Sequence, residues 1–134
     1  MKAEDDKTGK GRTDMGRKLV VVNAFLEEKL RFRIRKQAEG QGFDTLFFSS
    51  DEQALEHLAD AEILFCQSGS LACHAPMLRW QCTPSAGVTQ FFRPGVFASP
   101  NVLLSNSSGA YGVTISEHVV MVTLELLRRR AEYL

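Results

Sequence analysis

The sequence has few cysteines and histidines and no excess of either charge, and each shortage excludes a class of function. Three cysteines and three histidines are scattered over 134 residues without a CxxC pair or zinc-ligand spacing. Lysine plus arginine number 16, as do aspartate plus glutamate, so no net field attracts nucleic acid or anionic lipid. We therefore expect no metal site, no nucleic-acid partner and no membrane partner, and we interpret the cysteines as reduced thiols in a cytoplasmic protein.

Local catalytic and phosphate-binding motifs are missing as well. Two glycine clusters, at 9–11 and 40–42, lack both the GxGxxG spacing and the strand–turn–helix context of a dinucleotide cradle. The chain contains no phosphate loop, no GxSxG elbow and no HExxH motif. The three histidines are His57, His74 and His118, and no acid–base pair is visible among them. No catalytic residue is therefore assigned in this chain.

The N-terminal segment has no apolar run that would make it a secretory signal. We interpret residues 1–17 as a flexible leader. The remaining length and apolar content suit one globular domain with a single core.

Short apolar runs recur along the rest of the chain with 13 to 20 residues between them. They lie at 19–22, 43–48, 63–66, 80–83 and 102–105, and the first is β-branched as in a strand buried on both faces. The spacing leaves room for crossover helices. The sequence therefore predicts an α/β fold: a flavodoxin-like three-layer domain with a mostly parallel five-stranded sheet, spanning 18–113.

The connections have patterns typical of helices. Between the first two runs, the alternation of apolar residues and arginines at 30–35 is typical of a strand, whereas the four-residue repeat at Leu26, Leu30 and Ile34 is typical of a helix. Acidic residues at the start of this segment and basic residues at its end favour the helix. Asp51 can cap a second helix through Leu58, and Ser70 can cap a short third one.

The last segment predicts a helix with an unusual surface. Thr114 and Glu117 have the spacing of a capping box, so we expect a helix over 114–130 that begins there. Its residues are apolar around most of the circumference, yet the run is too short to span a bilayer. A sheet covers only one face of a helix, which predicts a second covering surface from a following domain or from a second copy of the chain.

Three polar stretches follow predicted strands and would meet at one edge of a parallel sheet, where ligands bind. The first contains Gln67 and Ser68, and the third runs over 105–112. The second is the small-residue loop Ser85, Ala86, Gly87 and Val88, whose backbone amides could converge on a carboxylate. The plainer alternative for each is a simple turn.

Three stretches, taken in order, resemble the D-isomer-specific 2-hydroxyacid dehydrogenase family. They are LRWQCTPSAGV at 78–88, NVLLSNSSG at 101–109 and ISEH at 115–118, the last continuing into an apolar helix with Arg128 and Arg129. The resemblance covers about residues 18–134 and departs from the family pattern at Thr89, where most relatives carry an aspartate.

The resemblance implies an NAD(P)-dependent oxidoreductase that acts on the CH–OH group of D-2-hydroxy acids and reduces 2-oxo acids. It implies that Ala86, Gly87 and Val88 offer amides to the substrate carboxylate, with Gln67 and Ser68 nearby. It also implies that Tyr111 and Thr114 lie near the nicotinamide end of NAD or NADP, which a Rossmann domain beyond this chain would bind mainly. Residues 114–134 would then be the interdomain helix, and this chain alone would be inactive.

The alternative is a stand-alone flavodoxin-like binding or dimerisation module that has no catalytic activity. In either case a homodimer is expected, because a second copy could cover the helix 114–130. A flavin-binding or response-regulator-like domain is a third, weaker interpretation, since no acidic cluster follows the first strand.

Overall fold

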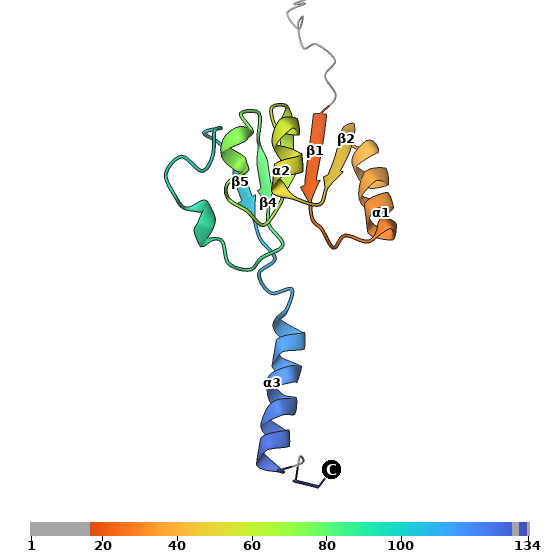
Figure 1. Cartoon of the computed structure of the whole chain (residues 1–134), viewed down its shortest axis with the longest axis vertical. Coiled ribbons are helices and arrows are strands. Elements are labelled where there is room, and N and C mark those ends of the chain that lie inside the picture. The colour runs from red at the N-terminus through yellow and green to blue at the C-terminus, as the bar shows by residue number, and fades with distance from the viewer. Residues whose placement is uncertain (1–16, 130–131, 134) are drawn as a thin grey trace, which may run out of the picture.

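The computed structural model describes residues 17–129 and 132–133, and its centre is one parallel sheet (Figure 1). The strands are β1 (Arg17–Val22), β2 (Phe43–Phe48), β3 (Ala61–Phe65), β4 (Trp80–Cys82) and β5 (Leu103–Ser105). Their order in the sheet is β2-β1-β3-β4-β5 and every pairing is parallel. This is the flavodoxin-like order, so the predicted fold class is confirmed.

The predicted strands correspond closely to the observed ones, with β3 beginning two residues early at Ala61. The predicted leader lies outside the described residues except for Arg17, which instead opens β1 and pairs with Phe43. Arg17 also stacks its guanidinium over the Phe43 ring at 4.0 Å, a contact that fixes this end of the sheet.

Helical segments connect the strands. They are α1 (Glu28–Glu39), α2 (Asp51–Ala54), the 3-10 turns η1 (Leu55–His57), η2 (Ala72–His74) and η3 (Thr89–Phe91), and the terminal α3 (Gly112–Leu127). The chain moves one way across the sheet from β1 to β2 and the opposite way from β2 to β3. Because parallel crossovers are right-handed, α1 and α2 cover opposite faces of the sheet. Helix α1 also confirms the helical interpretation of the segment that contains Leu30 and Ile34.

The main core lies between the sheet and the α2 side. It joins alternate strand residues to α2 and the connection that contains η2, and its fully buried large aliphatic side chains are Val20, Leu58, Leu64, Leu71 and Leu78. On the other face, α1 packs over β2. Trp80 and Leu103, which are paired in register, remain 43% and 71% exposed, so this face is open over β4 and β5.

The three predicted side-chain caps are wrong. Ser50, not Asp51, is the N-cap of α2, and the predicted helix changes to a 3-10 turn at Leu55. Leu71 precedes η2, while the Ser70 hydroxyl lies 2.6 Å from that of Ser68. For Ser70, the Ser68 hydroxyl takes the place of the expected cap bond.

The predicted capping box at the last helix is also wrong. Helix α3 begins at Gly112, two residues before Thr114, because Gly112 N already donates to Gly109 O and starts the turn. Thr114 is therefore inside the helix, and its hydroxyl donates to Tyr111 O at 3.1 Å. A helix is present there, but it spans Gly112–Leu127, so it begins two residues before the predicted start and ends before the predicted end at 130.

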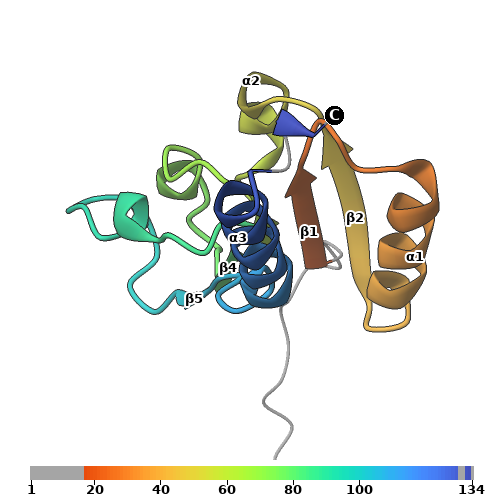
Figure 2. The same cartoon turned by 90° about the horizontal axis from the view of Figure 1, so that it is seen from below.

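Helix α3 projects away from the sheet beyond the carboxyl ends of the strands (Figures 1 and 2). None of its residues is buried. The sheet therefore covers no face of α3, although the sequence predicted that it would cover one. Its large apolar side chains lie open all round the helix: Val113, Ile115, Val119, Val120, Met121, Leu124, Leu126 and Leu127. Among the described residues, no helix is long and apolar enough to cross a membrane.

Candidate functional site

Three polar loops meet at the carboxyl edge of the sheet, as the sequence predicted. The loop 67–70 follows β3, the loop 85–88 follows β4, and the segment 106–111 leaves β5 and leads into α3. These strands are neighbours in the sheet, so their ends lie side by side. Hydrogen bonds then connect all three loops, with 85–88 at the centre.

The central loop, 85–88, is held by its carbonyl groups. Ser107 N donates to Ser85 O at 3.2 Å, and Asn106 Nδ2 donates to Ala86 O at 2.6 Å. Gln90 Nε2 donates to Gly87 O at 3.5 Å. Three consecutive carbonyls are thus fixed by donors from outside the loop.

Most backbone amides of the same loop, unlike its carbonyls, have no hydrogen-bond partner among the described residues. Ser85 N donates to Thr83 Oγ1 at 3.4 Å, but within the described part of the chain Ala86, Gly87 and Val88 donate their amides to no acceptor. Ala86 and Gly87 are also exposed, so water or a ligand reaches them. Successive unpaired amides of this kind bind anions, and a carboxylate provides two oxygens for them.

The loop 67–70 takes part in hydrogen bonds with its surroundings mainly through backbone carbonyls. Cys66 Sγ donates to Ser68 O at 3.1 Å, and Ser68 Oγ accepts from Ser70 N at 3.2 Å. Gln67 is exposed at the sheet edge, and its carbonyl accepts from Gln90 Nε2 at 3.3 Å. Gln67 and Ser68 therefore lie beside the central loop, and the Ser68 hydroxyl is occupied by its neighbours.

Tyr111 and Thr114 occupy the third side. Tyr111 O–H donates to Pro84 O at 3.4 Å, which places the phenol against the start of the central loop. The Thr114 hydroxyl is bonded to its own helix.

Sequence reasoning did not single out Asn106 and Gln90, although both bond to the central loop. Asn106 lay within a stretch recognised only as polar, and Gln90 follows the loop without belonging to any motif. Neither residue carries a local signal, because the bonds depend on how separate loops meet.

Titratable groups around the site include one strongly perturbed thiol. Burial raises the pKa of Cys66 to about 11, and a hydrogen bond from Gln81 partly opposes that rise. A thiol of that kind stays protonated and serves packing rather than nucleophilic attack. His57 stacks on Phe48 with ring centroids 4.9 Å apart, a packing role away from the loops.

The connection from β1 to α1 does not fit an NAD cradle. The connection from β1 to α1 reads Asn-Ala-Phe-Leu-Glu at 23–27, without the glycines that let a backbone approach a pyrophosphate. Among the described residues, no cluster of His, Cys, Asp or Glu could hold a metal ion.

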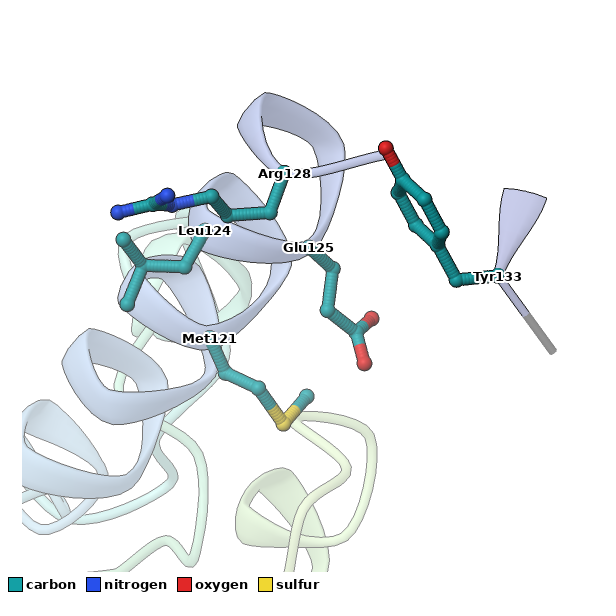
Figure 3. A pocket seen from close by; sticks show the side chains of 5 residues that line it. All are labelled: Met121, Leu124, Glu125, Arg128 and Tyr133. Atoms are coloured by element: carbon teal, nitrogen blue, oxygen red, sulfur yellow. The ribbon is translucent and has the colours of Figure 1, made fainter. Parts of the chain in front are cut away.

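A shallow pocket of about 440 Å³ lies at the end of α3 (Figure 3). Met121, Leu124, Glu125, Arg128 and Tyr133 line it. It belongs to the exposed apolar surface of the helix and has no part in the loop cluster.

No protein-family model matches the chain, and no curated protein matches it significantly. Solved structures do. A D-isomer specific 2-hydroxyacid dehydrogenase family protein from Aeromonas salmonicida subsp. salmonicida A449 matches at 23% identity and a TM-score of 0.71, over 88% of this chain. The NAD-dependent formate dehydrogenase from Staphylococcus aureus, solved in complex with NAD, matches at 21% identity and a TM-score of 0.60, over 86% of this chain.

The chain shares the fold of a part of these enzymes. It spans 38% of the first matched chain and 40% of the second. The resemblance drawn from the three sequence stretches is thereby confirmed at the level of the fold.

Proposed function

We propose that this chain is the substrate-binding part of an NAD(P)-dependent oxidoreductase that acts on D-2-hydroxy acids and reduces 2-oxo acids. Its own contribution is a wall that binds the substrate carboxylate through Ala86, Gly87 and Val88. Gln67 and Ser68 border the bound acid, and Tyr111 and Thr114 lie on the side from which the nicotinamide would approach. NAD or NADP would be held mainly by residues outside this chain.

The unpaired amides of the central loop carry this proposal. They lie in one exposed loop at the carboxyl edge of a parallel sheet, while the intervening carbonyls are bonded elsewhere. An anion that binds there would not have to displace internal hydrogen bonds or order the loop, and both of those costs weaken binding. The likeness to dehydrogenase structures adds support for the class of reaction.

We further propose that α3 leads to a dinucleotide-binding Rossmann domain and that the protein is a cytoplasmic homodimer. The exposed apolar circumference of α3 supports a covering surface from that domain or from a second copy. Free thiols at Cys66, Cys73 and Cys82 are consistent with a reducing compartment.

Glycolate titration by amide-resolved NMR tests the carboxylate wall. We expect the amide resonances of Ala86, Gly87 and Val88 to shift saturably, because an oxygen anion bonded to an amide deshields its proton. Glycolamide, which replaces the carboxylate with a neutral amide, is the matched control and should shift them much less. If the two ligands act alike, or if only amides of α1 respond, the carboxylate wall is refuted.

A turnover assay separates the enzyme part from a complete enzyme. This chain alone, mixed with NADH and glyoxylate or hydroxypyruvate, should consume no NADH above a protein-free control. Sustained NADH consumption by the purified chain would contradict the assignment of cofactor binding to residues elsewhere.

The alternative is a binding or dimerisation module without catalysis, and the exposed apolar surface of α3 favours it equally. Light scattering combined with the glycolate titration distinguishes the two. Self-association through α3 without any shift at Ala86, Gly87 and Val88 would support the module.

A further inference from the structure

Gln90 occupies a position between two of the three loops. It lies on η3, the 3-10 turn directly after the central loop. The next residue, Phe91, is 3% exposed, and its ring stacks on Phe97 with centroids 6.3 Å apart. Phe91 N also donates to Val88 O at 2.9 Å. The turn that carries Gln90 is therefore anchored by a buried aromatic side chain and by a bond to the central loop.

The Gln90 side chain reaches both loops with a single group. Its Nε2 lies 3.3 Å from Gln67 O and 3.5 Å from Gly87 O. A primary amide has two N–H donors, so each carbonyl can receive one of them. The side chain thereby connects the loop after β3 to the loop after β4.

A close backbone contact at the same place is independent of that side chain. A Cβ added at Gly69 would lie 2.8 Å from Gln90 O and 3.4 Å from Gln90 C. Real Cβ atoms essentially never approach backbone that closely, so a side chain at position 69 would push the η3 backbone away. Both the backbone and the side chain of Gln90 thus fix the distance between the two loops.

We propose that Gln90 is a positioning residue of the carboxylate site: by binding Gln67 O and Gly87 O together, it orients the Ala86, Gly87 and Val88 amides toward the ligand. The proposal rests on the carboxylate-binding function proposed above. The Gly87 carbonyl and the Val88 amide belong to one planar peptide group, so the bond from Gln90 holds that amide in one direction before an anion arrives. The Ala86 and Gly87 amides are adjacent to it in the same loop, and the bonds to Ser85 O and Ala86 O hold their own peptide groups.

The test compares Gln90→Ala and Gln90→Glu with the wild-type chain. Alanine removes both donors, and glutamate keeps the shape while it replaces the donors with an acceptor of negative charge. We expect glycolate affinity to fall about three- to tenfold for alanine, which matches the net value of one or two exposed hydrogen bonds, and further for glutamate. Gly69→Ala should lower the affinity by the separate route of backbone displacement. Gln37→Ala, on the exposed side of α1, is the matched control and should leave it unchanged.

Two further measurements separate positioning from general structure and from direct contact. The melting temperature of Gln90→Ala should fall only slightly, because the side chain makes two exposed hydrogen bonds and is not part of the core. Backbone ¹⁵N relaxation at 85–88, measured without ligand, should show increased motion in the same variant and not in Gln37→Ala.

Each outcome decides the proposal. Unchanged affinity and unchanged loop motion in Gln90→Ala would overturn it. Lower affinity with unchanged loop motion would also overturn it, since Gln90 would then act by direct contact. If glycolate does not bind the wild-type chain but Gln90→Ala still loosens 85–88, the carboxylate function fails and the positioning of the loop by Gln90 stands.

Discussion

Alkaline pH should destabilise this fold through Cys66, the residue directly before the loop 67–70. Its side chain is fully buried, and burial raises its pKa from the ordinary 9.0 to about 11. Burial penalises the thiolate, so the folded chain holds this proton more tightly than the unfolded chain does. The stability contributed by the neutral thiol is complete below pH 9.0 and is lost as the pH rises through about 11.

The size of the effect follows from those two values. Each tenfold change in acidity is worth about 1.4 kcal/mol, so a change from 9.0 to about 11 corresponds to about 2–3 kcal/mol. That is a large share of the stability of a small domain, which is on the order of 5–15 kcal/mol. Burial also raises the pKa of Cys82, which adds to the alkaline loss in the same direction.

Urea unfolding at a series of pH values between about 8 and 11 measures this loss through the free energy of unfolding. Cys66→Ala is the variant that isolates the effect, because it removes the buried thiol and retains Cys82. Its starting stability is lower, but its free energy of unfolding should fall less steeply with pH than that of the wild type. Parallel curves for the two proteins would refute the reasoning.

Two more predictions concern the site and the core. Asn106→Asp replaces the donor that lies 2.6 Å from Ala86 O with a charged acceptor, so glycolate affinity should fall about tenfold in the NMR titration, whereas Asn101→Asp on the exposed surface should leave it unchanged. Leu58→Ala at a fully buried position should lower the free energy of unfolding by about 2–5 kcal/mol. Leu126→Ala, at a residue 74% exposed on α3, should change it by less than about 0.5 kcal/mol in the same urea assay, and equal losses would contradict the assigned burial.

The strands were predictable because a parallel sheet demands local composition. A strand covered on both faces must be apolar on consecutive residues, and 19–22 satisfies that requirement in the sequence itself. The helix α1 was harder, because its arginines alternate with apolar residues as in a half-buried strand. The structure shows where two of those arginines lie: Arg31 and Arg35 pass over the Phe47 ring at 5.8 and 5.4 Å.

Helix starts and loop bonds could not be read in the same way. Thr114 has the right neighbours for a cap, but the turn that begins at Gly109 starts the helix before it. The donors that fix the central loop come from residues distant in the sequence: Asn106 bonds to Ala86 and Ser107 bonds to Ser85. Such bonds depend on how the ends of β4 and β5 are placed beside each other, which no local pattern encodes.

The arrangement of the segment 106–111 connects the site to the helix that follows it. Asn106 and Ser107 bond to the central loop, and Ser107 Oγ adds a second bond to Thr83 O at 3.3 Å. Tyr111, the N-cap of α3, reaches Pro84 O. The start of α3 is therefore tied at several points to the loop that offers its amides. Because these bonds join the start of α3 to the loop 85–88, a surface that packs on α3 would take a defined position relative to the proposed carboxylate site.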